Sequence, residues 1–152
     1  MSDRDERMQR FVDDHWADYA RAGSSWIGFY LINGAEDAMD LGPCRDTPAC
    51  SPIGLHGMCG RAWHTRRRLI IPDVHAHGTG HIVCDPRNLS EFVIPLLDDA
   101  GGCWGVFDAD SHRADCYREA DVEGVTRDLV AAGLTHDGAL TLPVEILTAR
   151  QG

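Results

Sequence analysis

The sequence predicts an α+β domain in which an antiparallel sheet carries its terminal helices on one face. Three observations support this: an amphipathic segment near each end, short β-branched or aromatic runs between them, and Gly and Pro clusters that separate the runs. With 152 residues the chain has the size of one ordinary domain. We expect a single domain over 1–152, with an N-terminal helix in 1–23 and a C-terminal tail, 135–152, of unassigned role.

The composition excludes several classes of protein. Hydrophobic residues make up 43% and charged residues 25%, as in a globular protein, and no apolar run approaches the roughly 20 residues that cross a bilayer. The charged N-terminus lacks the apolar core of a secretory signal, so we expect a cytoplasmic protein. A net charge of −10 disfavours nucleic acid as a partner. Residues 66–68 form the only dense basic run, which we expect to be a solvated helix end.

The first half of the chain begins with apolar residues at helical spacing over 5–21, which predicts a helix. The run 26–32 is rich in aromatic and β-branched residues and predicts a strand, followed by a hairpin to 38–41. Gly and Pro make 42–57 a long irregular loop. A short helix over 60–68, a short strand over 69–74 and a second loop over 75–88 follow.

The second half holds two strands, 91–97 and 103–111, joined by an acidic and glycine-rich turn that predicts an antiparallel pair. Apolar spacing predicts a helix over 119–134, and Gly133 is well placed to end it. The apolar segment 140–147 is either a last strand or an arm that faces a partner.

Cys84 is the first candidate for chemistry, because His75, His77 and His81 precede it in a glycine-containing loop. Positive charge lowers the pKa of a thiol and makes it a better nucleophile. The alternative is a buried cysteine that only packs as a small hydrophobe. The same four side chains are zinc ligand types, but their spacing lacks the tight pairs typical of zinc sites, and we predict no metal.

Five other cysteines accompany Cys84. Cys50 and Cys59 each end a flexible stretch, so either thiol could reach Cys84 and condense with its sulfenic acid to form a disulfide. The others lack such a context and are predicted to be packing residues: Cys44, Cys103 and Cys116.

Three acids stand out from the rest. Asp108 and Asp110 project to one face of a strand end, where two carboxylates suit an ammonium group, and Glu91 opens the neighbouring strand. The alternative is a set of solvated strand-end acids. Trp26 and Tyr30 share a face of the first strand, where they either form a pocket wall or pack in the core.

Several motifs in order resemble the free methionine-(R)-sulfoxide reductases, enzymes built on a single GAF domain. The resemblance runs from about Trp26 to Ser111 and rests on eight segments: WIGFYL, LGP, PAC, GMCG, LIIPDVHA, GHIVCD, SEFVIPL and GVFDADS. It implies a six-stranded antiparallel GAF sheet, reduction of free L-methionine (R)-sulfoxide through cysteine chemistry without a bound cofactor, and thioredoxin as the reductant.

The resemblance also implies roles for individual residues. Cys84 is the nucleophile, either Cys50 or Cys59 resolves its sulfenic acid, and Glu91 protonates the sulfoxide oxygen. The substrate is held by Asp108, Asp110, Trp26 and Tyr30. Family members are often dimers, so a homodimer is among the assemblies we expect.

Two departures from the family pattern concern the resolving step. Cys44 stands where the family usually has an aromatic residue, and the histidine loop is one residue longer, with His77 replacing an aromatic residue. Two other functions stay open: a non-catalytic GAF module that binds a small ligand, and a redox or metal sensor that uses the same thiols.

Overall fold

A computed structural model describes residues 2–80 and 84–148. These residues form one sheet with the strand order β3-β2-β1-β6-β5-β4-β7. The strands are β1 (Trp26–Ile32), β2 (Ala38–Arg45), β3 (Ile53–Gly54), β4 (Arg68–Ile71), β5 (Ser90–Leu97), β6 (Cys103–Ser111) and β7 (Val144–Ile146). The helices are α1 (Asp3–Arg21), α2 (Met58–Thr65) and α3 (Glu119–Ala131), and the 3-10 helices are η1 (Val74–Gly80) and η2 (Asp137–Thr141).

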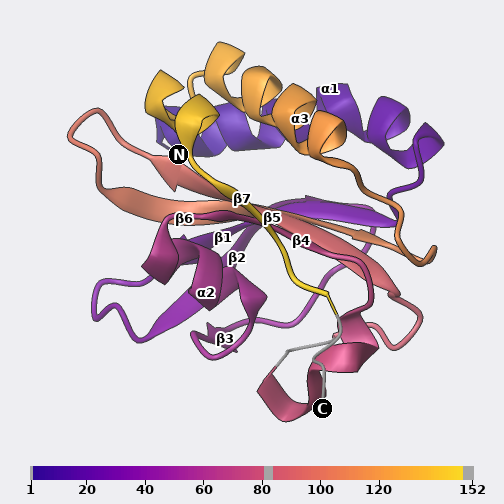
Figure 1. Ribbon diagram of the computed structural model, residues 1–152. Coiled ribbons are helices and arrows are strands. Elements are labelled where there is room, and N and C mark those ends of the chain that lie inside the picture. The colour runs from indigo at the N-terminus through magenta and orange to yellow at the C-terminus, as the bar shows by residue number, and fades with distance from the viewer. Residues whose placement is uncertain (1, 81–83, 149–152) are drawn as a thin grey trace.

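Helices α1 and α3 lie on one face of the sheet and α2 lies on the other (Figure 1). Helix α1 begins with a capping box, in which the Ser2 hydroxyl accepts from the Asp5 amide and the Asp5 carboxylate accepts from the Ser2 amide. Helix α3 ends before Gly133, whose φ of 72° is easily adopted only by glycine. Both predicted terminal helices are thereby confirmed, and no helix in 2–80 or 84–148 combines the length and apolar composition needed to span a bilayer.

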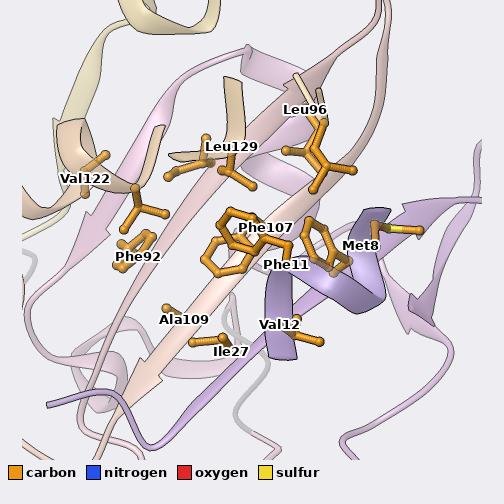
Figure 2. Close-up of a cluster of buried hydrophobic side chains, with 14 of the residues drawn as sticks. Met8, Phe11, Val12, Ile27, Phe92, Leu96, Phe107, Ala109, Val122 and Leu129 are labelled. Carbon is orange, nitrogen blue, oxygen red and sulfur yellow. The ribbon is translucent and has the colours of Figure 1, made fainter. Parts of the chain in front are cut away.

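The alternation of side chains along each strand divides the apolar residues between two cores. Ile27 and Phe29 of β1 point toward α1 and α3, whereas Trp26 and Tyr30 point toward α2. Phe107 lies at the centre of the first core, with ring centroids 5.5 Å from Phe11 and 5.2 Å from Phe29. Figure 2 shows this core packed between α1, α3 and the sheet. The first core holds the domain together, so the second face is available for a site.

The predicted α+β class is confirmed, but the sheet differs in two details from the six antiparallel strands that we expected. Seven strands are present in the described residues, and β7 pairs parallel with β4 while the other neighbours pair antiparallel. Of the two alternatives for 140–147, the strand is the one observed. Its short apolar run carries no signal for the direction of pairing, which depends on the path of the preceding chain.

The prediction that Arg66 to Arg68 form a solvated helix end is wrong for Arg68. Arg66 does end α2 in a left-handed conformation, with φ of 57°. Arg68 instead begins β4 and is only 2% exposed. Its guanidinium donates to the carbonyl oxygens of Leu140 and Leu142 and lies 2.9 Å from the Glu123 carboxylate. It therefore anchors the segment that leads into β7.

Two predicted loops contain regular structure. The loop assigned to 42–57 is in part strand, because β2 continues to Arg45 and the short β3 follows. The histidine loop assigned to 75–88 begins with the 3-10 helix η1. Glycine and proline made both segments look irregular in sequence, but pairing with β1 and the pattern of 3-10 hydrogen bonds outweigh that local signal.

Candidate active site

A row of three side chains crosses the sheet on its α2 face. Asp110 of β6 pairs with Trp26 of β1 on one side and with Glu91 of β5 on the other. Asp108, two residues before Asp110, projects from the same face of β6. It pairs with Gly28, where an added Cβ would collide with the Trp26 ring, so the glycine leaves room for the indole.

The row forms the floor of a cavity of about 40 Å³ between the sheet and the segments that cover it. Of the eight residues predicted for the site, seven line this cavity: Trp26, Tyr30, Cys59, Cys84, Glu91, Asp108 and Asp110. Cys50, the eighth, lines a larger outer hollow of about 580 Å³ that also contains Trp26, Cys84 and Asp110. The fold thus brings together the residues that the sequence analysis selected.

The three acids lie in an environment that favours their protonated forms. Glu91 is 5% exposed and Asp108 is 4% exposed. Burial, followed by repulsion from Asp108, raises the pKa of Glu91 well above its usual range. Burial also raises the pKa of Asp108 to about 6 and that of Asp110 well above its ordinary value. Burial and repulsion from Asp108 thus favour the protonated form of Glu91, which makes it suitable as a general acid.

Cys59 lies in the first turn of α2, where its side chain is buried. We expected it at the end of a flexible stretch, and the helix instead holds the thiol in place. Its sulfur lies within 4.8 Å of carboxylate oxygens of Glu91 and Asp108. Burial raises the pKa of this thiol well above its usual value, and the negative charge of Asp108 adds to the effect. Cys59 is therefore a poor nucleophile in this environment.

Cys50 and Cys84 are joined by a disulfide, with their Cα atoms 5.8 Å apart. The sequence analysis left Cys50 and Cys59 as equal candidates to pair with Cys84, and the observed pair includes Cys50. Two side chains of β1 also hold the segment around Cys50 in place. The indole of Trp26 donates to the carbonyl of Thr47 at 2.7 Å, and the Tyr30 hydroxyl donates to the carbonyl of Cys50 at 2.8 Å.

His75 and Cys84, two of the four side chains of the zinc ligand types, have protein partners. Nε2 of His75 lies 2.9 Å from the carbonyl oxygen of Asn88, so this ring connects η1 to the segment after Cys84. Cys84 itself is held in the disulfide, and His77 is half-buried. His81 falls outside the described residues. Two members of the proposed His and Cys ligand set are thus engaged with other groups.

Sequence reasoning missed Asn88 and Met58, which also line the cavity. Asn88 is only 7% exposed, and its side-chain oxygen accepts from the Ser25 hydroxyl at 3.3 Å. Nothing in its sequence context distinguishes it from the polar loop residues around it. Met58 belongs to the apolar cluster on this face, where a methionine gives no signal beyond ordinary packing. The other three cysteines lie apart from the cavity lining, at Cys44, Cys103 and Cys116.

Comparisons with known proteins agree with this arrangement. A sequence profile described as GAF domain matches residues 9–131. The chain is 38% identical over 105 residues to "GAF domain-containing protein A" of Dictyostelium discoideum, an alignment that covers 68% of this chain and 65% of the relative. It is also 38% identical over 109 residues to "Free methionine-R-sulfoxide reductase" of Escherichia coli, covering 70% of this chain and 62% of the relative. The chain thus spans less than two thirds of each of these relatives.

A solved structure gives a longer match. The free methionine-R-sulfoxide reductase of Neisseria meningitidis, determined in complex with its substrate, is 30% identical and superposes with a TM-score of 0.77. The comparison covers 91% of this chain and 80% of the other.

Proposed function

This chain belongs to the GAF domain family, and we propose that it reduces free L-methionine (R)-sulfoxide to L-methionine. The observation that carries the proposal is one cavity in which Cys84, Glu91 and the aspartates meet beneath the Cys50–Cys84 disulfide. Relatives in Escherichia coli and Neisseria meningitidis that bear the name of this reductase support it.

The reaction begins with the attack of the Cys84 thiolate on the sulfoxide sulfur. Glu91 gives a proton to the sulfoxide oxygen, which otherwise leaves poorly, and the oxygen is transferred to Cys84 as a sulfenic acid while the substrate becomes a sulfide. Cys84 lines the inner cavity with the acids, whereas Cys50 lines only the outer hollow, and this difference supports Cys84 as the nucleophile.

The second half of the cycle regenerates the thiols. The Cys50 thiol attacks the sulfenic acid, water leaves, and the disulfide forms. An external dithiol, for which we propose thioredoxin, then reduces the disulfide by exchange. In the disulfide form the inner cavity of about 40 Å³ has room for only about three waters. Reduction must therefore open the cavity before the next substrate enters.

Free methionine sulfoxide differs from a peptide-bound residue by its ammonium group. Asp108 and Asp110 project together from β6 and line the cavity, so their carboxylates can hold that group. Trp26 and Tyr30, whose ring centroids are 6.1 Å apart, form an aromatic wall suited to the S-methyl end. The chemistry requires reduced thiols, and we propose that the protein works in the cytoplasm, with a homodimer as its expected assembly.

One coupled assay tests the proposal. Consumption of NADPH is followed with thioredoxin and its reductase, while the two epimers of free methionine sulfoxide are supplied separately. We expect turnover of the R epimer only, near-complete loss in Cys84→Ser, and full activity in the control Cys116→Ser. Full turnover in Cys84→Ser would show that Cys84 is not the nucleophile. Inactivity toward both epimers would favour the non-catalytic ligand-binding module or the thiol-based sensor.

A further inference from the structure

Acidic groups dominate the polar lining of the inner cavity in the part of the chain that the structure describes. Three carboxyl groups, of Glu91, Asp108 and Asp110, face it together with the Cys59 thiol. None of the described residues that line it is Arg, Lys or His. A buried cavity with this much potential negative charge favours either protons or a cationic ligand.

Three of these groups converge closely enough to share one ion. The Cys59 sulfur and carboxylate oxygens of Glu91 and Asp108 lie within 4.8 Å of one another, and all three residues are buried. Asp108 is 96% buried, and its Oδ1 has no hydrogen-bond partner among the described residues. A buried carboxylate oxygen in that state is an open ligand position.

The ligand types fit zinc better than the harder cations. Zinc takes thiolate sulfur at about 2.3 Å and carboxylate oxygen at about 2.0–2.2 Å, so neighbouring ligand atoms of a tetrahedral ion lie roughly 3.3–3.8 Å apart. The observed spread of up to 4.8 Å needs a contraction of about 1 Å, well within side-chain rotation. Magnesium and calcium take oxygen ligands and would leave the sulfur unused.

We propose that Cys59, Glu91 and Asp108 form a zinc-binding site inside the cavity. The ion displaces the proton of the Cys59 thiol and those of the carboxyl groups, and solvent completes its coordination. Cys59 thereby acquires a role that its inertness as a nucleophile does not suggest. This site is distinct from the His and Cys set considered in the sequence, with which it shares no residue.

The site also implies regulation, and this part rests on the proposed function. Zinc on Glu91 and Asp108 occupies the carboxylates that the substrate ammonium and the sulfoxide oxygen require. Zinc and methionine sulfoxide should therefore exclude each other, and zinc should act as a competitive inhibitor of the reductase.

The binding test uses the oxidised protein, in which Cys50 and Cys84 are held in the disulfide and provide no thiolate. Zinc is titrated by calorimetry, and cobalt(II) is used as a spectroscopic probe because a thiolate ligand gives it a near-ultraviolet charge-transfer band. We expect one ion per chain, a cobalt–thiolate band, and release of protons. Cys59→Ser and Asp108→Asn should each weaken zinc by at least about 100-fold, since even outer-shell partners are worth 10- to 100-fold.

Cys103→Ser is the matched control, because Cys103 is also buried but lies outside the cavity. It should retain wild-type zinc affinity. A cobalt–thiolate band that persists in Cys59→Ser, or zinc binding that is equal in all variants, would overturn the site. If Cys59→Ser unfolds, Asp108→Asn decides alone.

Competition separates this inference from the proposed function. Binding that methionine sulfoxide leaves unchanged in the reduced protein would leave the zinc site standing and remove the substrate from this cavity. If zinc does not bind to a protein that reduces the R epimer, the zinc site is overturned and the proposed function stands.

Discussion

Cys50 and Cys84 lie 34 residues apart in the chain, yet a disulfide joins them directly above the acidic cavity. The bond links the segment between β2 and β3 to the segment before β5. Hydrogen bonds from Trp26 and Tyr30 hold the first of these segments against β1. Cys50 is thus positioned by the strand that carries both aromatic residues.

Replacement of Cys50 should separate the chemical step from recycling. In Cys50→Ser, Cys84 can still take the oxygen of one substrate, but its sulfenic acid has lost the observed disulfide partner. We expect about one methionine per protein in a single-turnover experiment, and loss of thioredoxin-dependent turnover. Cys44→Ser, which changes a partly exposed cysteine outside the disulfide, serves as the control. Undiminished steady-state turnover in Cys50→Ser would assign resolution to another thiol.

Asp108 should make the protein less stable as pH rises. Its pKa is 3.8 when unperturbed and about 6 in the fold, so the folded state resists ionisation. The free energy of unfolding is therefore highest below about pH 4, decreases between about pH 4 and pH 6, and is constant above that. Between these two pKa values the free energy of unfolding decreases by about 1.4 kcal/mol per pH unit, a total on the order of 3 kcal/mol.

Asp108→Asn tests this effect, because an amide does not titrate. Urea unfolding in the presence of EDTA should show the variant more stable than the wild type at pH 7 and about equal to it at pH 3.5. Asp99→Asn, an exposed change in the turn between β5 and β6, should leave the pH profile unaltered. Equal stability of Asp108→Asn and wild type at pH 7 would contradict the burial of a destabilised carboxylate.

The buried Arg68 should contribute far more to stability than its neighbour Arg67. Arg68→Met leaves the Glu123 carboxylate and two carbonyl oxygens without their charged donor, and we expect a loss of about 3 kcal/mol. Arg67 is half-exposed and pairs with Glu145, so Arg67→Met should change stability by less than about 1 kcal/mol. Urea unfolding of the two variants makes the comparison, and similar losses would refute the anchoring role of Arg68.

Two helical glycines should respond oppositely to alanine. A Cβ on Gly60 would collide with the backbone of Leu55, so Gly60→Ala must displace the start of α2 and with it Cys59. We expect a loss of roughly 1–3 kcal/mol. A Cβ on Gly124 of α3 would meet no atom within 4 Å, and Gly124→Ala should stabilise by about 0.5–1 kcal/mol. Thermal unfolding distinguishes the two, and a stabilising Gly60→Ala would mean that the packing of α2 is looser than described.

The sequence predicts best the elements whose signal is local. The bounds of β1 and β6 coincide with the predicted ranges 26–32 and 103–111, because alternation and flanking turns define such strands without reference to the rest of the chain. The same alternation placed Trp26 with Tyr30 and Asp108 with Asp110, each pair on one face. Local context also selected Cys84, Cys50, Cys59 and Glu91, and the motif resemblance then implied a role for each of them.

What the sequence determined by itself is therefore the set of reactive side chains and the faces from which they project. Tertiary structure alone decided how they combine: Cys50 meets Cys84, while α2 holds Cys59 against Glu91 and Asp108. It also buried Arg68 beneath the C-terminal segment and added β7 to the sheet. The physical reason is that dihedral preference and side-chain period act over a few residues, whereas pairing, burial and pKa depend on groups that the folded chain brings together from distant positions.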